Sequence, residues 1–207
     1  MPKVLRYFDI GGLAEAIRYI LHYTDQKFED VRYEYKSWPI KEVKDAIPYG
    51  QLPILEDGDR VLNQSIAIAR YVATNTELLP TDVWKQAQLD AIVLTIYDFH
   101  KHVANVIYAK TPEDKAEIKK KLFDEFLDFY FSKFEKKLKD NNGYFGGKLS
   151  WADFMFVGII ESANLFLENE IQKDYPTISK LVQIVQGLPR VKEYIKARKP
   201  YEINLKT

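Results

Sequence analysis

The sequence of 207 residues contains no cysteine. A chain without cysteine forms no disulfide bond, binds no metal ion through thiolates and has no redox-active thiol of its own. The sequence also has no charged start followed by an apolar run of signal-peptide length, and no apolar run of about 18 residues that could cross a membrane. We therefore expect a cytoplasmic protein that does not enter a membrane.

An excess of charge of either sign is also missing, because 30 lysine and arginine residues balance 30 aspartate and glutamate residues. Proteins that bind nucleic acid or acidic membrane surfaces without sequence preference usually carry an excess of positive charge. This sequence has no such excess. The three histidines, His22, His100 and His102, give no metal-ligand set. The composition therefore predicts no nucleic-acid partner and no metal site, and it leaves a small molecule as the expected ligand.

Enough apolar residues are present for a packed core, since 46% of the sequence is hydrophobic and 14% is aromatic. Before residue 80, strand-like runs alternate with helical segments at about 13–24 and 65–76. The strand-like runs cover residues 4–8, 31–35, 53–56 and 60–63. Their order, with a proline-led strand, a hairpin and a helix at the end, is that of a thioredoxin-like α/β domain.

The strand signals stop after residue 82. Apolar residues then recur at intervals of three and four over residues 89–106 and 127–138, as on one face of long helices. Ser150 and Asp153 form a capping-box pattern that marks a further helix start, and two more helices are expected between residues 177 and 197. The predicted organisation is a thioredoxin-like domain, a linker and an all-helical domain, at residues 1–76, 77–82 and 83–207 respectively.

Two features of the stretch from residue 49 to residue 73 indicate a ligand site. Pro53 lacks a donor for a sheet ladder and fits the entrance of a strand, where the backbone of Leu52 can pair with an extended peptide. Gln64 and Ser65 open the next helix, where free amides, a hydroxyl and the positive end of the helix dipole suit a carboxylate. An ordinary N-cap at Ser65 explains the pair equally well. The absence of cysteine favours a ligand that brings its own thiol.

Several motifs occur in the order and spacing of one known family. They are YF at 7–8 followed by GGLAEAIRY, WP at 38–39, PYGQLPILEDG at 48–58, NQSIAIARYVA at 63–73, DAIVLTIYDF at 90–99 and KLSWADF at 148–154. Over nearly its whole length the chain resembles the cytosolic glutathione S-transferases of the sigma class, which also contains the haematopoietic prostaglandin D synthases and the lens S-crystallins of cephalopods. The resemblance implies a glutathione-binding thioredoxin-like domain and an all-helical domain that forms a pocket for a hydrophobic substrate.

The resemblance assigns the catalytic role to Tyr7, whose hydroxyl would donate a hydrogen bond to the sulfur of bound glutathione. A free thiol has a pKa of about 8.5 and is only a few per cent ionised at pH 7. A hydrogen bond to the charged form lowers that pKa, and a decrease of about two units would leave the sulfur mostly anionic at neutral pH. Without the resemblance, Tyr7 is one of 14 tyrosines, and a strand residue packed on a helix is the simpler interpretation.

The resemblance also implies the other contacts with glutathione, which serves as co-substrate. Trp38 and Lys44 match residues at its glycyl end, with Lys41 as an alternative to Lys44. Asp98 matches a carboxylate that reaches glutathione in the neighbouring subunit, so a homodimer is implied. The expected glutathione-binding residues are Tyr7, Leu13, Trp38, Lys44, Gly50, Gln51, Leu52, Pro53, Gln64 and Ser65, with Asp98 serving the partner subunit.

The pocket for the hydrophobic substrate is expected over the catalytic tyrosine, with walls at Phe8, Leu13, Phe99, Asn105, Phe156 and Leu205. Two departures from the family pattern bear on its chemistry. Gly11 and Leu13 stand where the family often has arginine, so a cation near the thiolate is missing. Leu94 and Tyr97 stand at the companion positions of Asp98, where the metal-activated prostaglandin synthases are acidic, and no metal is therefore expected.

Three functions are compatible with the resemblance. The first is conjugation of glutathione to hydrophobic electrophiles, including unsaturated aldehydes from lipid oxidation, with glutathione peroxidase activity on lipid hydroperoxides. The second is an isomerase of the prostaglandin D synthase type, against which the absence of a tryptophan near position 105 argues. The third is a non-catalytic, ligand-holding protein of the S-crystallin type, which a long insertion in the helical half or a loss of site residues would mark; the sequence has neither.

Overall fold

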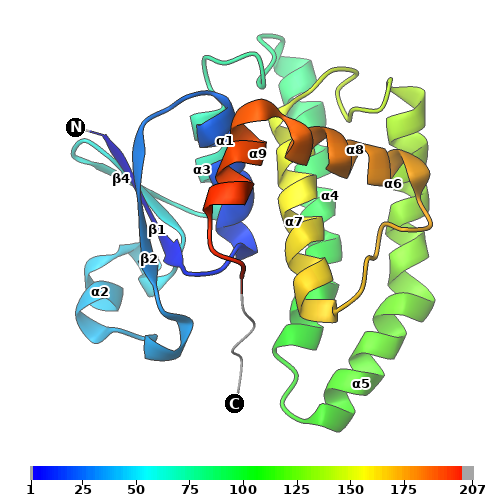
Figure 1. The fold of residues 1–207 in the computed structure, drawn as a ribbon, viewed down its shortest axis with the longest axis horizontal. Coiled ribbons are helices and arrows are strands. Elements are labelled where there is room, and N and C mark those ends of the chain that lie inside the picture. Colours follow the sequence, from blue (N-terminus) through cyan, green and yellow to red (C-terminus); the bar gives the residue numbers. More distant parts are fainter. Residues whose placement is uncertain (1, 202–207) are drawn as a thin grey trace.

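The computed structural model describes residues 2–201 and has an α/β part beside a helical part (Figure 1). The first part contains β1 (Lys3–Phe8), α1 (Glu15–Tyr23), β2 (Phe28–Tyr33), α2 (Lys41–Ala46), β3 (Ile54–Asp57), β4 (Arg60–Asn63) and α3 (Ser65–Val72). The second contains α4 (Val83–Ile107), α5 (Pro112–Lys121), a π-helical turn η4 (Leu122–Leu127), α6 (Asp128–Asp140), α7 (Trp151–Leu167), α8 (Pro176–Gly187) and α9 (Pro189–Ala197).

The four strands form one sheet in the order β2-β1-β3-β4. β1 runs parallel to β2 and antiparallel to β3, and β3 forms an antiparallel hairpin with β4. This arrangement confirms the predicted thioredoxin-like fold and the predicted hairpin. The second strand was predicted at 31–35 but lies at Phe28–Tyr33, because all six residues of β1 pair with it, from Lys3 opposite Phe28 to Phe8 opposite Tyr33.

α1 lies between the sheet and the helical part, where it contacts α3, α7 and α9 (Figure 1). Every residue of α1 from Glu15 to Leu21 is buried. α7 is the central helix of the second part, since it contacts α4, α8 and α1, and its residues 151–160 are all buried. The two parts therefore share one hydrophobic core along the α1–α7 contact. Within residues 2–201, no helix is both long enough and apolar enough to cross a membrane.

The start of α7 carries the capping box that the sequence predicted. The carboxylate of Asp153 accepts hydrogen bonds from the amide and the hydroxyl of Ser150, each at 2.7 Å, and from the amide of Phe145 at 2.9 Å. Burial raises the pKa of Asp153 to about 6, and these hydrogen bonds oppose the rise. Its carboxylate therefore holds the helix start and the preceding loop together.

The close contact between α1 and α7 depends on Gly158. A Cβ atom at this position would lie 2.8 Å from the amide nitrogen of Ala16 and 3.0 Å from its Cβ. We expect Gly158→Ala to lower the free energy of unfolding, measured by urea denaturation, by ~1–3 kcal/mol, because the two helices would have to move apart. Gly187→Ala, at the end of α8, is the control, since no heavy atom lies within 4 Å of its added Cβ. Equal stability of the two variants would contradict the close contact.

Candidate functional site

A cavity of about 380 Å³ lies at the end of the sheet where β1 ends and β3 begins, and we call it the site cavity. It gathers residues from the end of β1, from the turn between β1 and α1, from the segments before α2 and β3, from the start of α3 and from the end of α4. The lining residues are Phe8, Leu13, Tyr35, Trp38, Gly50, Gln51, Leu52, Pro53, Gln64, Ser65 and Tyr108. Nine of these were predicted as site residues, whereas Tyr35 and Tyr108 were not.

One wall of the site cavity is aromatic. The ring of Phe8 meets the rings of Tyr35 and Trp38 edge to face, with centroids 5.1 and 5.5 Å apart. The ring of Tyr7 also packs on Phe8, with the centroids 5.1 Å apart. Such edge contacts hold the rings in fixed relative positions, so the end of β1 and the loop after β2 present one continuous apolar surface to a ligand.

Tyr7 lies next to this wall at the end of β1, and its side chain is almost fully buried, with 6% exposed. Its hydroxyl oxygen accepts a hydrogen bond of 3.1 Å from the amide of Leu13. The hydroxyl hydrogen is therefore left to donate to another group. Gly12 allows this geometry, because a Cβ there would lie only 2.6 Å from the Tyr7 hydroxyl, and its φ is +48°.

The environment of Tyr7 keeps its hydroxyl protonated. Burial raises the pKa of Tyr7 well above the usual value, and the smaller effect of the Leu13 amide, which lowers the pKa, does not cancel the rise. Because the neutral phenol is favoured throughout the physiological pH range, Tyr7 can act as a hydrogen-bond donor but not as a base at neutral pH.

The start of α3 is not capped by a side chain. Gln64 precedes the helix with φ +72° and makes no capping hydrogen bond. Ser65 is the first helical residue, and its hydroxyl bonds to the hydroxyl of Tyr97 on α4. The interpretation of Ser65 as an ordinary N-cap is therefore wrong. The amides of the first turn remain available to an anion in the site cavity.

Four of the residues predicted to contact glutathione lie outside the lining of the site cavity: Tyr7, described above, and Lys41, Lys44 and Asp98. Lys44 stands directly behind it, because a Cβ on Gly50 would lie 3.1 Å from Cγ and Cε of Lys44. Lys41, the alternative, forms an ion pair with Asp45 on the exposed face of α2. Asp98 is exposed and bound to Lys101 at 2.9 Å.

The predicted hydrophobic pocket is wrong at two positions. Phe99 and Phe156 are fully buried and belong to the aromatic core of the helical part. The ring of Phe99 packs on Phe131 at 5.0 Å, and Phe156 packs on Phe134 and Phe145, each at 5.1 Å. These side chains are inaccessible to a substrate because neighbouring rings enclose them. Leu205 lies outside the described residues.

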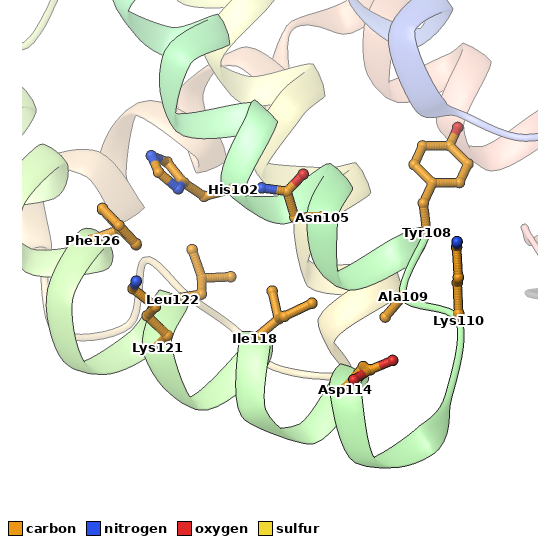
Figure 2. Close-up of a pocket in the computed structure, with 10 residues that line it drawn as sticks. All are labelled: His102, Asn105, Tyr108, Ala109, Lys110, Asp114, Ile118, Lys121, Leu122 and Phe126. Atoms are coloured by element: carbon orange, nitrogen blue, oxygen red, sulfur yellow. The ribbon is translucent and has the colours of Figure 1, made fainter.

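Asn105 lies in a second cavity, of about 550 Å³, between the end of α4 and α5. Figure 2 shows His102 and Asn105 of α4 facing Ile118 and Leu122 of α5, with Tyr108 at one end. Its lining residues are His102, Asn105, Tyr108, Ala109, Lys110, Asp114, Ile118, Lys121, Leu122 and Phe126. The ring of His102 stacks on Phe126 at 3.7 Å. Tyr108 lines both cavities, so the second cavity adjoins the site cavity.

The described part of the chain has no group of three or more histidine, aspartate or glutamate residues placed to hold a metal ion. The protein has no thiolate that could bind a metal ion, because the sequence contains no cysteine. The polar groups that face the site cavity are instead amides, hydroxyls and one indole, which suit a neutral or anionic organic ligand.

Comparisons with known proteins agree with this geometry. Two family models match, "Glutathione S-transferase, N-terminal domain" over residues 3–74 and "Glutathione S-transferase, C-terminal domain" over residues 97–198. Glutathione S-transferase S1 of Drosophila melanogaster is 39% identical over 203 residues, covering 96% of this chain and 80% of that protein. Hematopoietic prostaglandin D synthase of Homo sapiens is 35% identical over 206 residues, covering 96% of this chain and 98% of that protein.

The solved structures give the same result. Prostaglandin synthase D of Nilaparvata lugens superimposes with a TM-score of 0.91 at 35% identity, covering 97% of this chain and all of that one. A glutathione S-transferase from Ascaris lumbricoides gives a TM-score of 0.86 at 30% identity, covering 97% of this chain and 99% of that one. Because 30–35% of the aligned residues are identical, these proteins share sequence as well as fold with this chain.

The contact between Gly12 and Tyr7 gives a test of the site geometry. We expect Gly12→Ala to lower the free energy of unfolding by ~1–3 kcal/mol more than Gly58→Ala, because the added methyl group meets the Tyr7 hydroxyl. Both glycines have positive φ, +48° and +63°, but nothing lies within 4 Å of a Cβ at Gly58. Urea denaturation of the two variants separates the contact from the backbone effect. Equal losses would show that Tyr7 does not lie against Gly12.

Proposed function

This chain belongs to the glutathione S-transferase family, and from that premise we propose that it conjugates the thiolate of glutathione to hydrophobic electrophiles. The observation that carries the proposal is the state of the Tyr7 hydroxyl. It accepts a hydrogen bond from the amide of Leu13 and keeps its own hydrogen, at the end of the strand whose last residue, Phe8, lines the site cavity. A donor in this position favours the anionic form of a sulfur atom.

The site cavity suits glutathione in size and in the distribution of polar groups. Its volume of about 380 Å³ falls in the usual range of small-molecule sites, about 300–1,000 Å³. We place the γ-glutamyl carboxylate at the uncapped start of α3, beside Gln64 and Ser65, where amides and the helix dipole favour an anion. The cysteinyl backbone pairs with Leu52, and the glycyl end lies toward Trp38 and Lys44.

The proposed chemistry needs no acid or base from the protein at the sulfur. The thiol of bound glutathione loses its proton to water, and the Tyr7 hydroxyl stabilises the thiolate by donating to it. The sulfur then forms a bond to the electrophilic carbon. An aryl halide loses its halide ion, whereas an unsaturated aldehyde gains the sulfur at its β-carbon and a proton from water at its α-carbon. Each unit by which the thiol pKa falls represents ~1.4 kcal/mol in favour of the thiolate.

We propose that the hydrophobic substrate lies against Phe8, Leu13 and Tyr108 and extends into the second cavity. Tyr108 supports this placement, because its side chain lines both cavities and is 70% exposed. The floor of the second cavity is apolar at Ile118 and Leu122, while lysines stand at its edge. A long unsaturated aldehyde from lipid oxidation fits this shape, since its alkyl chain would occupy the apolar floor.

Reduction of lipid hydroperoxides follows from the same thiolate. The sulfur attacks the terminal oxygen of the hydroperoxide, the oxygen–oxygen bond breaks, and a lipid alcohol forms with the sulfenic acid of glutathione. A second glutathione then gives glutathione disulfide and water. The reaction uses two molecules of glutathione and no other reductant, so the proposed site can serve both activities.

We further propose a cytoplasmic homodimer in which Asp98 reaches the γ-glutamyl amine of glutathione bound to the partner subunit. Asp98 supports this by its position, since it is exposed on α4 and does not line the site cavity of its own chain. Leu94, one helical turn earlier on the same face, is 55% exposed although it is apolar. A partner subunit that covered this face of α4 would bury the apolar side chain of Leu94.

An isomerase of the prostaglandin D synthase type is the second candidate. It is favoured by the 35% identity to the human protein of that name and by the TM-score of 0.91 to the insect structure described as a prostaglandin synthase. Asn105 does not favour it, because it leaves the second cavity without the tryptophan expected near this position. Incubation with the prostaglandin endoperoxide separates the candidates, since an isomerase forms one prostaglandin and consumes no glutathione.

Tyr7→Phe tests the proposed role of the hydroxyl. In a pH titration of thiolate absorbance, we expect glutathione bound to the wild type to ionise ~1–2 units below its free pKa of about 8.5, and Tyr7→Phe to reverse most of that shift. Turnover at pH 6.5 should fall about tenfold for each unit by which Tyr7→Phe raises the pKa of the bound thiol. Tyr175→Phe, in the helical part, is the control and should leave the titration unchanged. A thiol that ionises normally in the wild type would contradict the proposal.

Ile118→Glu tests the place of the hydrophobic substrate. A carboxylate on the floor of the second cavity should raise the KM for a nine-carbon unsaturated aldehyde about tenfold, because the alkyl chain can no longer be desolvated there. The KM for acrolein, which is too short to enter, should change by less than twofold. Ala116→Glu, exposed on the same helix, is the matched control. Equal effects on both aldehydes would place the long chain elsewhere.

A further inference from the structure

A side chain of the helical part reaches the start of α3. Tyr97 lies on α4, and its hydroxyl bonds to the hydroxyl of Ser65. Ser65 is 4% exposed, lines the site cavity and begins the helix whose first turn is uncapped. The contact therefore joins two elements that are 32 residues apart in sequence at the point where we place a carboxylate of the ligand.

The groups around this contact are neutral at physiological pH. Burial raises the pKa of Tyr97 to about 12, although the bond to Ser65 opposes the rise. The ring of His100 lies 5.7 Å from the ring of Tyr97, and burial lowers the pKa of His100 to about 4. Since neither side chain is charged, the contact is a neutral hydrogen bond.

The chemistry of the two hydroxyls indicates the direction of the bond. A phenol is more acidic than an aliphatic alcohol and is the better donor, so Tyr97 donates and the Ser65 oxygen accepts. The hydrogen of Ser65 is then free to point into the site cavity. Consecutive hydrogen bonds in a buried site strengthen one another, because each donor is polarised by the one behind it.

We propose that Tyr97 is a positioning residue for glutathione, which orients the hydroxyl of Ser65 toward the γ-glutamyl carboxylate. The inference rests on the proposed function of the site cavity and adds a residue that contacts the ligand only through Ser65. The phenol of Tyr97 serves its own subunit's cavity.

The test is a double-mutant cycle between positions 97 and 65, read by calorimetric titration with glutathione. We expect Tyr97→Phe to weaken binding about fivefold in the wild-type background, as for the loss of one neutral hydrogen bond. In the Ser65→Ala background the same change should have less than a 1.5-fold effect, because its target is absent. Tyr130→Phe, on α6, is the control and should bind as the wild type does.

Two further measurements distinguish positioning from a general structural role. An analogue with 4-aminobutyrate in place of the γ-glutamyl residue lacks the carboxylate, and it should bind equally well to the wild type and to Tyr97→Phe. Turnover at saturating glutathione and the pKa of the bound thiol should be unchanged in Tyr97→Phe, so that only the KM for glutathione rises.

Different results would contradict the proposed function and the role of Tyr97. A wild type that does not bind glutathione would overturn the proposed function together with this inference. If the wild type binds glutathione but Tyr97→Phe binds equally well, or loses as much affinity in the Ser65→Ala background or for the analogue, the role of Tyr97 is refuted and the proposed function stands.

Discussion

The geometry of the site depends on the buried guanidinium of Arg18. A fully buried charge is tolerated only when its donors are paired, and a missing partner costs several kcal/mol. The partners are the carbonyl oxygens of Ile10 at 2.7 Å and Phe8 at 3.3 Å, Glu15 at 3.1 Å and Asp30 at 3.0 Å. Because two of them are backbone atoms at the end of β1 and in the turn that follows it, this one side chain fixes the segment that carries the Leu13 amide to the Tyr7 hydroxyl.

Glu15 connects the same turn to the end of the chain. The hydroxyl of Tyr201 donates to its carboxylate at 2.6 Å, and the guanidinium of Arg198 lies 3.1 Å away. Burial raises the pKa of Glu15, and Arg18 and Arg198 oppose the rise. The ring of Tyr201 also covers Gly11, since a Cβ there would lie 3.1 Å from the ring. The space that an arginine would need at position 11 is thus occupied by a tyrosine from the segment after α9.

Hydrophobic period and turn chemistry predicted most of the fold and four residues of the site cavity, Leu52, Pro53, Gln64 and Ser65, whereas the other five predicted lining residues came from the family resemblance. Period and turn chemistry located the hairpin, the capping box and the order of elements, because each has a local signal. They missed α5, which has no buried residue and therefore no apolar period. At Phe99 the period correctly indicated an inward side chain, but a hydrophobic period does not distinguish a packed core from a cavity wall. Nothing in the sequence indicated the contact between Tyr97 and Ser65, because only the folded chain brings the two hydroxyls together.

The proposed reaction requires one negative charge, and the difference in burial between the two candidate groups decides where it resides. The phenol of Tyr7 is almost fully enclosed, so the phenolate is strongly disfavoured and its pKa lies above the usual value. The sulfur of glutathione would lie in a cavity whose lining includes the exposed residues Gln51, Gln64 and Tyr108, and its intrinsic pKa of about 8.5 is already the lower of the two. When the coupled pair loses a proton, the charge therefore collects on the sulfur while Tyr7 keeps its hydrogen. The burial that makes Tyr7 a poor acid is thus what allows it to stabilise the nucleophile.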